Sequence, residues 1–269
     1  MRIRILGTAA SEGIPAMYCE CAICKKAKLL GGREIRTRTS ALIDGLLKID
    51  HPPDSFSQFL RYRIDYTKVR YIFITHAHRD HLAEMEFRHS KPGYCHRLSG
   101  KVIGLYGPSD ALALIQPWIS PDACVAPRQL AAFTPVEAKP YTVWPVKAHH
   151  NTAEPYNYIV ERAGRRVLYA CDTGFYQQET WDFLAGRKLD MVVADSTMGL
   201  AKGAHRHHMG LDDVVRFRAQ CELIGATHAR TRWVLSHFSH NGRALHRDLA
   251  KAARAHKMTV AYDGIELEV

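Results

Sequence analysis

The sequence lacks the long apolar runs that would place it in a membrane. No apolar stretch among its 269 residues approaches the roughly 20 residues that a helix needs to cross a bilayer. The first six residues follow an alternating strand pattern, without the long apolar region and cleavage site of a signal peptide. We therefore expect a soluble, cytoplasmic protein with no membrane partner.

Other familiar signatures are missing as well. The chain has no Gly-rich phosphate-binding fingerprint, no G-x-S-x-G nucleophile turn and no run of heptads. Its seven cysteines are an odd number, and three of them fall within Cys19–Cys24, which argues against a disulfide framework. The 37 basic and 27 acidic residues give a net charge of +10, but no long Lys/Arg run. This charge favours an anionic substrate through electrostatic steering, and nucleic acid is an alternative that we do not favour.

The most informative stretch is Thr75–His81, in which four metal-capable side chains fall within six residues: His76, His78, Asp80 and His81. It follows directly after Val69–Ile74, an apolar run whose β-branched and aromatic residues predict a buried strand. The end of such a strand is where α/β folds usually place their chemistry. Because imidazole and carboxylate groups suit a metal such as zinc, we favour a metal site over a solvated histidine-rich turn.

A second cluster lies near the N-terminus. Cys19, Cys21 and Cys24 form a C-x-C-x-x-C pattern at the end of an irregular loop. Three thiols on one turn supply three of the four ligands of a closed tetrahedral zinc site. The alternative is three reduced, partly buried cysteines, because the triplet by itself has no fourth ligand.

Strand patterns outnumber helical patterns along the chain, and polar clusters follow several strand ends. Thr39–Asp44 and Leu46–Asp50 predict a hairpin, Asp54 is expected to cap a helix over Ser55–Arg63, and Leu211–Leu223 has helical periodicity. A layered sandwich of two mixed sheets, with helices outside and a site along one rim, accounts for this order.

The motif within His76–His81 resembles that of the metallo-β-lactamase superfamily. Later motifs recur in the order that this family uses: His150 after a rim strand, Asp172 in a C-D-T-G setting and His237 at the end of a late strand. The resemblance extends over nearly the whole chain. It implies a single domain over residues 1–269 of the α/β (α+β) class, a four-layer αββα sandwich of two mixed β-sheets flanked by helices.

The resemblance also implies a dinuclear site that holds two divalent metals, Zn²⁺ or Mn²⁺. One ion would be bound by His76, His78 and His150, the other by Asp80, His81 and His237, with Asp172 bridging the pair. His150 is preferred to His149 because the residues around it, including Ala153–Pro155, best match the family's spacing. His149 would then point outward, or it would contact a metal ligand without binding the metal itself.

Within the superfamily, Leu6–Thr8, the cysteine triplet and His237–His240 resemble the PhnP-type phosphodiesterases, which hydrolyse cyclic phosphates. In that group three loop cysteines and a histidine bind a structural zinc, which implies Cys19, Cys21, Cys24 and His240 here. His208 matches a further active-site histidine that would donate a proton to the leaving oxygen, and His205 or His207 are alternatives for this role. With Asp80, His208 is our candidate catalytic residue.

The expected protein is therefore a metal-dependent hydrolase, most closely a phosphodiesterase in which a metal-bridging hydroxide attacks phosphorus. Its substrate would be an anionic small molecule, a cyclic phosphate or a nucleotide-like phosphodiester, and a homodimer is considered. Thioester or lactam hydrolysis and RNA processing on the same fold are alternatives, and a non-catalytic nucleic-acid-binding module is an alternative of another class. The B-type proteins of pyrroloquinoline-quinone biosynthesis share the cysteine–histidine feature but tend to lack a full dinuclear ligand set.

Overall fold

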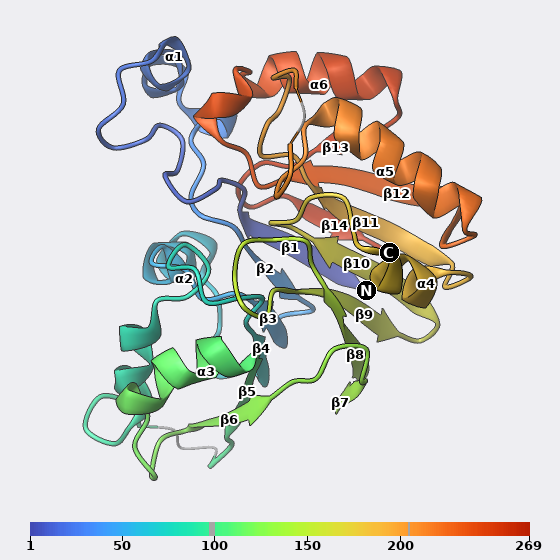
Figure 1. Ribbon diagram of the computed structural model, residues 1–269. Helices are drawn as coiled ribbons and strands as arrows, with labels where there is room; N and C mark the ends of the chain where they lie inside the picture. Colours follow the sequence, from blue (N-terminus) through green and yellow to red (C-terminus); the bar gives the residue numbers. More distant parts are fainter. Residues whose placement is uncertain (97–99, 204) are drawn as a thin grey trace.

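The computed structural model describes residues 1–96, 100–203 and 205–269. Within these residues two seven-stranded sheets lie face to face, and helices cover their outer faces (Figure 1). The strand order is β14-β1-β2-β3-β4-β5-β6 in the first sheet and β13-β12-β11-β10-β9-β8-β7 in the second. Both sheets contain parallel and antiparallel pairs, so the predicted αββα sandwich of mixed sheets is confirmed.

The first sheet carries α2 (Ser55–Tyr62) and α3 (Ser109–Ile115) on its outer face (Figure 1). Its β2–β3 pair is the predicted antiparallel hairpin, and the strands from β3 to β6 run parallel. Its strands are β1 (Arg2–Gly7), β2 (Ser40–Ile43), β3 (Leu47–Ile49), β4 (Tyr71–Phe73), β5 (Ile103–Gly107), β6 (Val125–Gln129) and β14 (Glu266–Glu268).

The second sheet is covered by α4 (Gln178–Leu184), α5 (Leu211–Leu223) and α6 (His246–Ala255). The short helix α1 (Ala22–Leu30) stands away from both sheets at the end of the N-terminal loop (Figure 1). The strands of the second sheet are β7 (Val136–Ala138), β8 (Tyr141–Lys147), β9 (Tyr156–Arg162), β10 (Arg165–Ala170), β11 (Leu189–Asp195), β12 (Thr227–Ser236) and β13 (Thr259–Val260).

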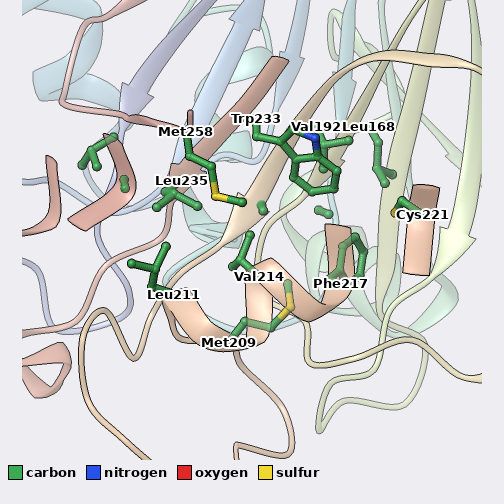
Figure 2. Packing of buried hydrophobic residues seen from close by; sticks show 14 of the residues in the cluster. Leu168, Val192, Met209, Leu211, Val214, Phe217, Cys221, Trp233, Leu235 and Met258 are labelled. Atoms are coloured by element: carbon green, nitrogen blue, oxygen red, sulfur yellow. The ribbon is translucent and has the colours of Figure 1, made fainter. Parts of the chain in front are cut away.

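Strand periodicity divides the apolar side chains among three packed layers. Met191 and Val193 of β11 enter the core between the sheets, whereas Val192 packs with the helices outside the second sheet. Figure 2 shows this outer layer, in which Phe217 of α5 and Trp233 of β12 lie over the sheet. A third cluster joins the first sheet to α2 and α3. The sheets are thus fixed on both faces, which gives the strand ends at one rim a rigid support.

Four local predictions differ from the structure. Asp54 does not cap α2 with its side chain, because its carboxylate instead accepts from the backbone N–H of Arg38 at 2.9 Å. The sequence pattern predicts helices over Phe175–Leu184 and His81–Phe87, but α4 begins at Gln178 and the second is a 3-10 segment, η2 (Glu84–Ser90). The pattern also predicts a strand over Trp233–Leu235 alone, whereas β12 has ten residues, because the mostly polar Thr227–Arg232 gives no apolar signal.

No helix in the described part of the chain has the length and apolar character that a membrane crossing requires. This agrees with the sequence expectation for membrane spans, while the cellular compartment stays a prediction.

Candidate metal centre

The motif His76–His81 lies in a turn that the neighbouring strand holds in place. Asp50 follows β3, and its Oδ1 accepts from the backbone N–H of Thr75 at 2.8 Å and from the Thr75 hydroxyl at 2.9 Å. The turn closes on itself through the His81 N–H, which donates to the His78 carbonyl at 3.0 Å. Because β3 and β4 run parallel, their carboxyl ends deliver Asp50 and the motif to the same rim.

Three imidazoles and one carboxylate form a first donor group. His78 Nδ1 lies 3.1 Å from His76 Nε2 and 3.1 Å from His150 Nε2. Asp172 Oδ2 is 3.2 Å from His76 Nε2 and 3.3 Å from His150 Nε2. The four donor atoms can therefore face one ion.

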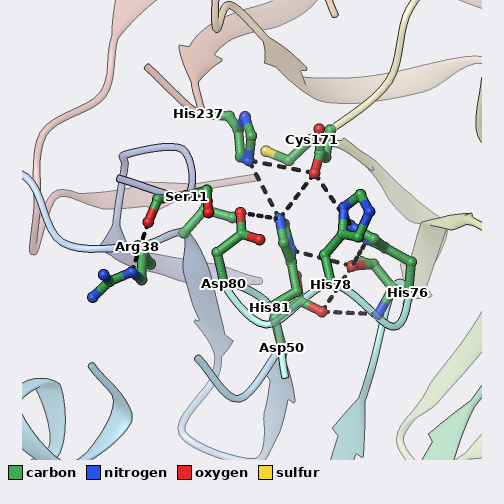
Figure 3. Close-up of polar contacts among 12 residues, drawn as sticks. Ser11, Arg38, Asp50, His76, His78, Asp80, His81, Cys171 and His237 are labelled. Carbon is green, nitrogen blue, oxygen red and sulfur yellow. Dashed lines mark hydrogen bonds and ion pairs between the residues drawn. The ribbon is translucent and has the colours of Figure 1, made fainter. Parts of the chain in front are cut away.

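A second donor group shares Asp172 with the first. Figure 3 shows three of its other members, Asp80, His81 and His237. His81 Nε2 lies 3.3 Å from His237 Nε2, 3.4 Å from Asp80 Oδ2 and 3.1 Å from Asp172 Oδ2. His237 Nε2 is 3.7 Å from the same Asp172 oxygen. One carboxylate oxygen is thus common to two sets of donors, which is the arrangement that a bridging ligand needs.

The spacing of these donors is close to that of two nitrogens bound to one metal ion. Two nitrogens at the usual distance from a tetrahedral zinc lie about 3.3–3.4 Å apart. The imidazole nitrogens of the two groups are 3.1, 3.1 and 3.3 Å apart. The buried His and Asp clusters are therefore consistent with a dinuclear metal site, and the assignment of each residue as a ligand stays a prediction.

Two relays that the sequence did not reveal orient the histidines. His76 Nδ1 donates to the Thr75 hydroxyl at 2.9 Å, and that hydroxyl donates to Asp50. In the second relay His237 Nδ1 donates to Thr197 Oγ1 at 2.7 Å, and Thr197 Oγ1 donates to Asp195 Oδ2 at 3.0 Å. Each relay fixes the proton on Nδ1 and leaves Nε2 free for a metal.

Asp50 also contacts a predicted ligand directly, since His81 Nδ1 donates to its Oδ2 at 2.7 Å. Asp50 directly follows the buried strand β3, and Asp195 is the last residue of the buried strand β11. A carboxylate at the end of an apolar strand was the available sequence signal, but it marks many surface turns equally well.

Backbone conformation at the rim is unusual. Asp172 and His237 both adopt positive φ, at 58° and 63°, which non-glycine residues rarely do. Gly174 is required for space, because a Cβ there would lie 2.0 Å from the carbonyl oxygen of Arg206. This contact brings the histidine-rich loop against the C-D-T-G turn.

The electrostatics favour positive charge at the rim. Burial acts to raise the pKa of Asp172, but the surrounding imidazoles, His237 first among them, hold that pKa well below its usual range. Burial acts to lower the pKa of His81, but Asp50 and then Asp80 raise it well above its ordinary value. The carboxylates stay ionised and attract a cation.

His208 lies beside the second donor group rather than within either predicted ligand set. Its Nδ1 is 3.1 Å from Asp172 Oδ1 and 3.5 Å from Asp195 Oδ2. Burial disfavours the charged ring, but these two carboxylates raise its pKa to about 10. His208 with Asp172, Asp195 and His237 also forms a donor group of its own.

The other histidines considered for the site lie differently. His149 turns away from the donors, and its Nδ1 donates to the Phe175 carbonyl at 2.9 Å. His205 Nδ1 lies 2.7 Å from Asp213 Oδ2, and His207 packs against His149. The structure therefore brings His150 and His208, and not these three, to the donor atoms.

The cysteine triplet meets His240, as the resemblance implied. Cys19 Sγ and Cys21 Sγ each lie 3.4 Å from His240 Nδ1, and Cys24 completes the group. Backbone N–H groups point at the sulfurs, for example Ala16 N at 3.3 Å from Cys24 Sγ. Burial acts to raise the pKa of Cys21, but the Cys24 N–H and the His240 ring lower it to about 6. The group could hold a structural metal.

A cleft of about 460 Å³ opens over the donor groups. His78, Asp80, Asp172, His208 and His237 line its floor. Further polar residues surround them: Ser11, Glu12, Arg79, Asn151, Ser239 and Asn241.

Comparison with known proteins decides the family. Residues 42–238 match the model of the β-lactamase superfamily domain, and this span includes every His and Asp donor of the two groups. The chain belongs to the metallo-β-lactamase superfamily. The resemblance predicted from the motif is thus confirmed.

Solved structures of this superfamily cover the whole chain. A diphosphatase from the PhnP family is 25% identical, with a TM-score of 0.76 over all of this chain and 97% of that one. Zinc-bound PqqB from Methylobacterium extorquens is 20% identical, with a TM-score of 0.77 and full coverage of both chains. The short form of human tRNase Z is 16% identical, with a TM-score of 0.68, covering all of this chain and 99% of that one. The last two likenesses show the fold alone.

A curated octanoyltransferase from Porphyromonas gingivalis is 33% identical over 90 residues. That match covers 32% of this chain and only 17% of the octanoyltransferase. A match of this extent does not show that the chain belongs to that family.

Proposed function

We propose that this protein is a dinuclear-metal-dependent phosphodiesterase that acts on a cyclic phosphate or a nucleotide-like phosphodiester. The observation that carries the proposal is the single Asp172 oxygen shared by the two donor groups. The likeness to a PhnP-family diphosphatase, over the full chain, supports phosphorus chemistry rather than thioester or lactam hydrolysis.

The residues fit a pair of divalent ions. His76, His78, His150 and Asp172 would hold one Zn²⁺ or Mn²⁺, and Asp80, His81, His237 and Asp172 the other. When bound, such a pair lowers the pKa of a water molecule and neutralises phosphoryl oxygens. Cys19, Cys21, Cys24 and His240 would hold a structural Zn²⁺ that ties the N-terminal loop to the segment after β12.

His208 is the proposed proton donor to the leaving oxygen. Its Nδ1 faces the carboxylates of Asp172 and Asp195, so only Nε2 is available to a substrate in the cleft. The raised pKa keeps the ring protonated at neutral pH. A protonated imidazole can give its Nε2 proton to a departing alkoxide as the P–O bond breaks.

The rest of the cleft suits an anion. Arg79 is exposed on the motif turn and lines the opening, where it can bind a phosphoryl oxygen. Asn151 and Asn241 offer amide groups to the sugar or base of a nucleotide. The net charge of +10 adds long-range attraction for such a substrate.

The test is hydrolysis of bis(p-nitrophenyl) phosphate and of 2′,3′-cyclic nucleotides by metal-saturated protein. Turnover should need metal and should fall about 10²–10⁴-fold in His208→Gln, the usual contribution of a general acid. His149→Gln is the matched control, because it changes a nearby histidine that faces away from the donors. Absence of metal-dependent turnover on every phosphodiester, with the metal sites filled, would refute the proposal.

A diphosphate linkage is the second candidate substrate, because the 25%-identical structure is described as a diphosphatase. It needs the same attack at phosphorus but releases a phosphate, which is a better leaving group than an alkoxide. If the His208→Gln variant hydrolyses a nucleoside diphosphate ester as fast as the wild-type protein does, this candidate is favoured over the phosphodiester. The homodimer and the preference for a small anionic substrate over nucleic acid remain predictions, checked by light scattering and by RNA titration at two salt concentrations.

A further inference from the structure

Two cysteines outside the donor groups lie side by side on the far side of the first sheet. Cys95 Sγ is 3.5 Å from Cys124 Sγ, and 29 positions separate the two residues. Both are half-buried, whereas Cys171 and Cys221 are buried in the packed layers. Cys95 and Cys124 are therefore a close pair that a small reagent can reach.

The backbone already holds the pair together. The Ser90 carbonyl accepts from the backbone N–H of Cys124 at 2.8 Å and from the Cys95 thiol at 3.4 Å. The Cys124 carbonyl in turn accepts from the Ile103 N–H at 2.8 Å, which fixes it beside β5. To reach the disulfide bond length of about 2.05 Å the sulfurs need to approach by about 1.5 Å, which is within the reach of side-chain rotation.

Other contacts order the turn that leads to Cys95. The Arg88 guanidinium donates to Tyr94 Oη at 3.2 Å, and Glu86 Oε2 lies 3.4 Å from His89 Nδ1. In disulfide exchange the thiolate is the reactive form of a cysteine.

We propose that Cys95 and Cys124 form a reversible intrachain disulfide when the protein meets a low-molecular-weight disulfide such as oxidised glutathione. The Cys95 thiolate attacks one sulfur of the reagent and releases one glutathione thiol, giving a mixed disulfide. Cys124 then loses its proton and displaces the second glutathione thiol. Two protein thiols and one reagent disulfide become one protein disulfide and two glutathione thiols, so atoms and electrons balance.

The bond acts on the segment that follows the metal motif. η2 begins at Glu84, two residues after Leu82, and ends at Ser90. A disulfide ties Cys95, five residues after that end, to the residue before β6. Closing a loop of this length restricts the unfolded chain, and a rise in melting temperature of roughly 5 °C or more is expected. Proteolysis after Arg88 is expected to slow as well, because the crosslink restrains the turn that follows it.

The experiment treats the zinc-loaded full chain with oxidised glutathione, blocks remaining thiols with an alkylating reagent and maps the tryptic peptides by mass. The expected product joins the peptide with Cys95 to the peptide with Cys124, and dithiothreitol separates them. Cys95→Ser and Cys124→Ser each abolish this product and the rise in melting temperature. Cys221→Ser, the matched control, keeps both.

The result that overturns the proposal is also visible in the wild-type protein. It is alkylation of both cysteines after treatment, a glutathione adduct that stays on Cys95, or a crosslink to a different cysteine. Because the peptide map is made on the wild-type protein, the test remains decisive even if a serine variant fails to fold.

Discussion

Asp195→Asn is the sharpest perturbation of the metal centre, because it changes one atom outside both predicted ligand sets. The Asp195 carboxylate is fully buried and accepts from Thr197 N, Thr197 Oγ1, Asp172 N and Met209 N at 2.9–3.1 Å. Its Oδ2 also lies 3.4 Å from His237 Nδ1. An amide nitrogen cannot accept, so at least one of these donors loses its partner.

The expected magnitude follows from that loss. A charge-assisted hydrogen bond contributes about 1.5–3 kcal/mol, and removing the partner behind a metal-binding histidine typically weakens metal affinity about 10–100-fold. We expect Asp195→Asn to bind the second ion, held by Asp80, His81 and His237, at least about 10-fold more weakly, which is about 1.4 kcal/mol. Hydrolysis should recover at high metal concentration if His208 keeps its place.

The assay is metal release against a competing chelator, followed together with circular dichroism. Asp190→Asn is the control, because Asp190 lies near the other end of β11 and pairs with Arg165 and the backbone of Arg166. Unchanged metal affinity in a folded Asp195→Asn protein would refute the proposed relay through Thr197.

Three further predictions concern the rest of the chain. Burial lowers the pKa of Lys48 to about 7 from 10.5, so the unfolded chain binds more protons between these pH values. The free energy of unfolding should therefore rise with pH across that window, by at most about 1.4 kcal/mol per pH unit. Urea unfolding at several pH values should show this rise in the wild type and not in Lys48→Met. An identical pH dependence in both proteins would contradict the prediction. Phe217→Ala should cost about 3–5 kcal/mol in guanidinium unfolding, since the ring is fully buried, and a loss below 1 kcal/mol would be inconsistent with its packing. His240→Ala should lose one zinc per chain by elemental analysis while the other metals stay, and three retained metals would exclude the cysteine–histidine site.

The sequence predicted the parts of the site whose chemistry is local or ordered. Four donors within His76–His81 mark a metal turn by themselves, and His150, Asp172 and His237 followed from the order of the family's motifs. His150, rather than His149, lies with the other donors of the first group, and its role as a ligand stays a prediction.

The parts that could not be predicted depend on contacts between distant segments. Asp50 and Asp195 carry no local pattern, and their role depends on the threonines and histidines that folding brings to them. Asp54 had the right position for a cap, but Arg38 lies closer to its carboxylate. β14 was missed although Ile265–Val269 alternates between apolar and acidic residues, because the strand is only three residues long. That residues 1–269 form a single domain stays a prediction, which one cooperative unfolding transition would support.

The most direct test of the central claim is anomalous diffraction from crystals of protein supplied with zinc. We expect two anomalous difference peaks on either side of the Asp172 carboxylate. One should lie beside His76, His78 and His150, and the other beside Asp80, His81 and His237. A single peak, or none, in contact with Asp172 at saturating zinc would contradict a dinuclear centre.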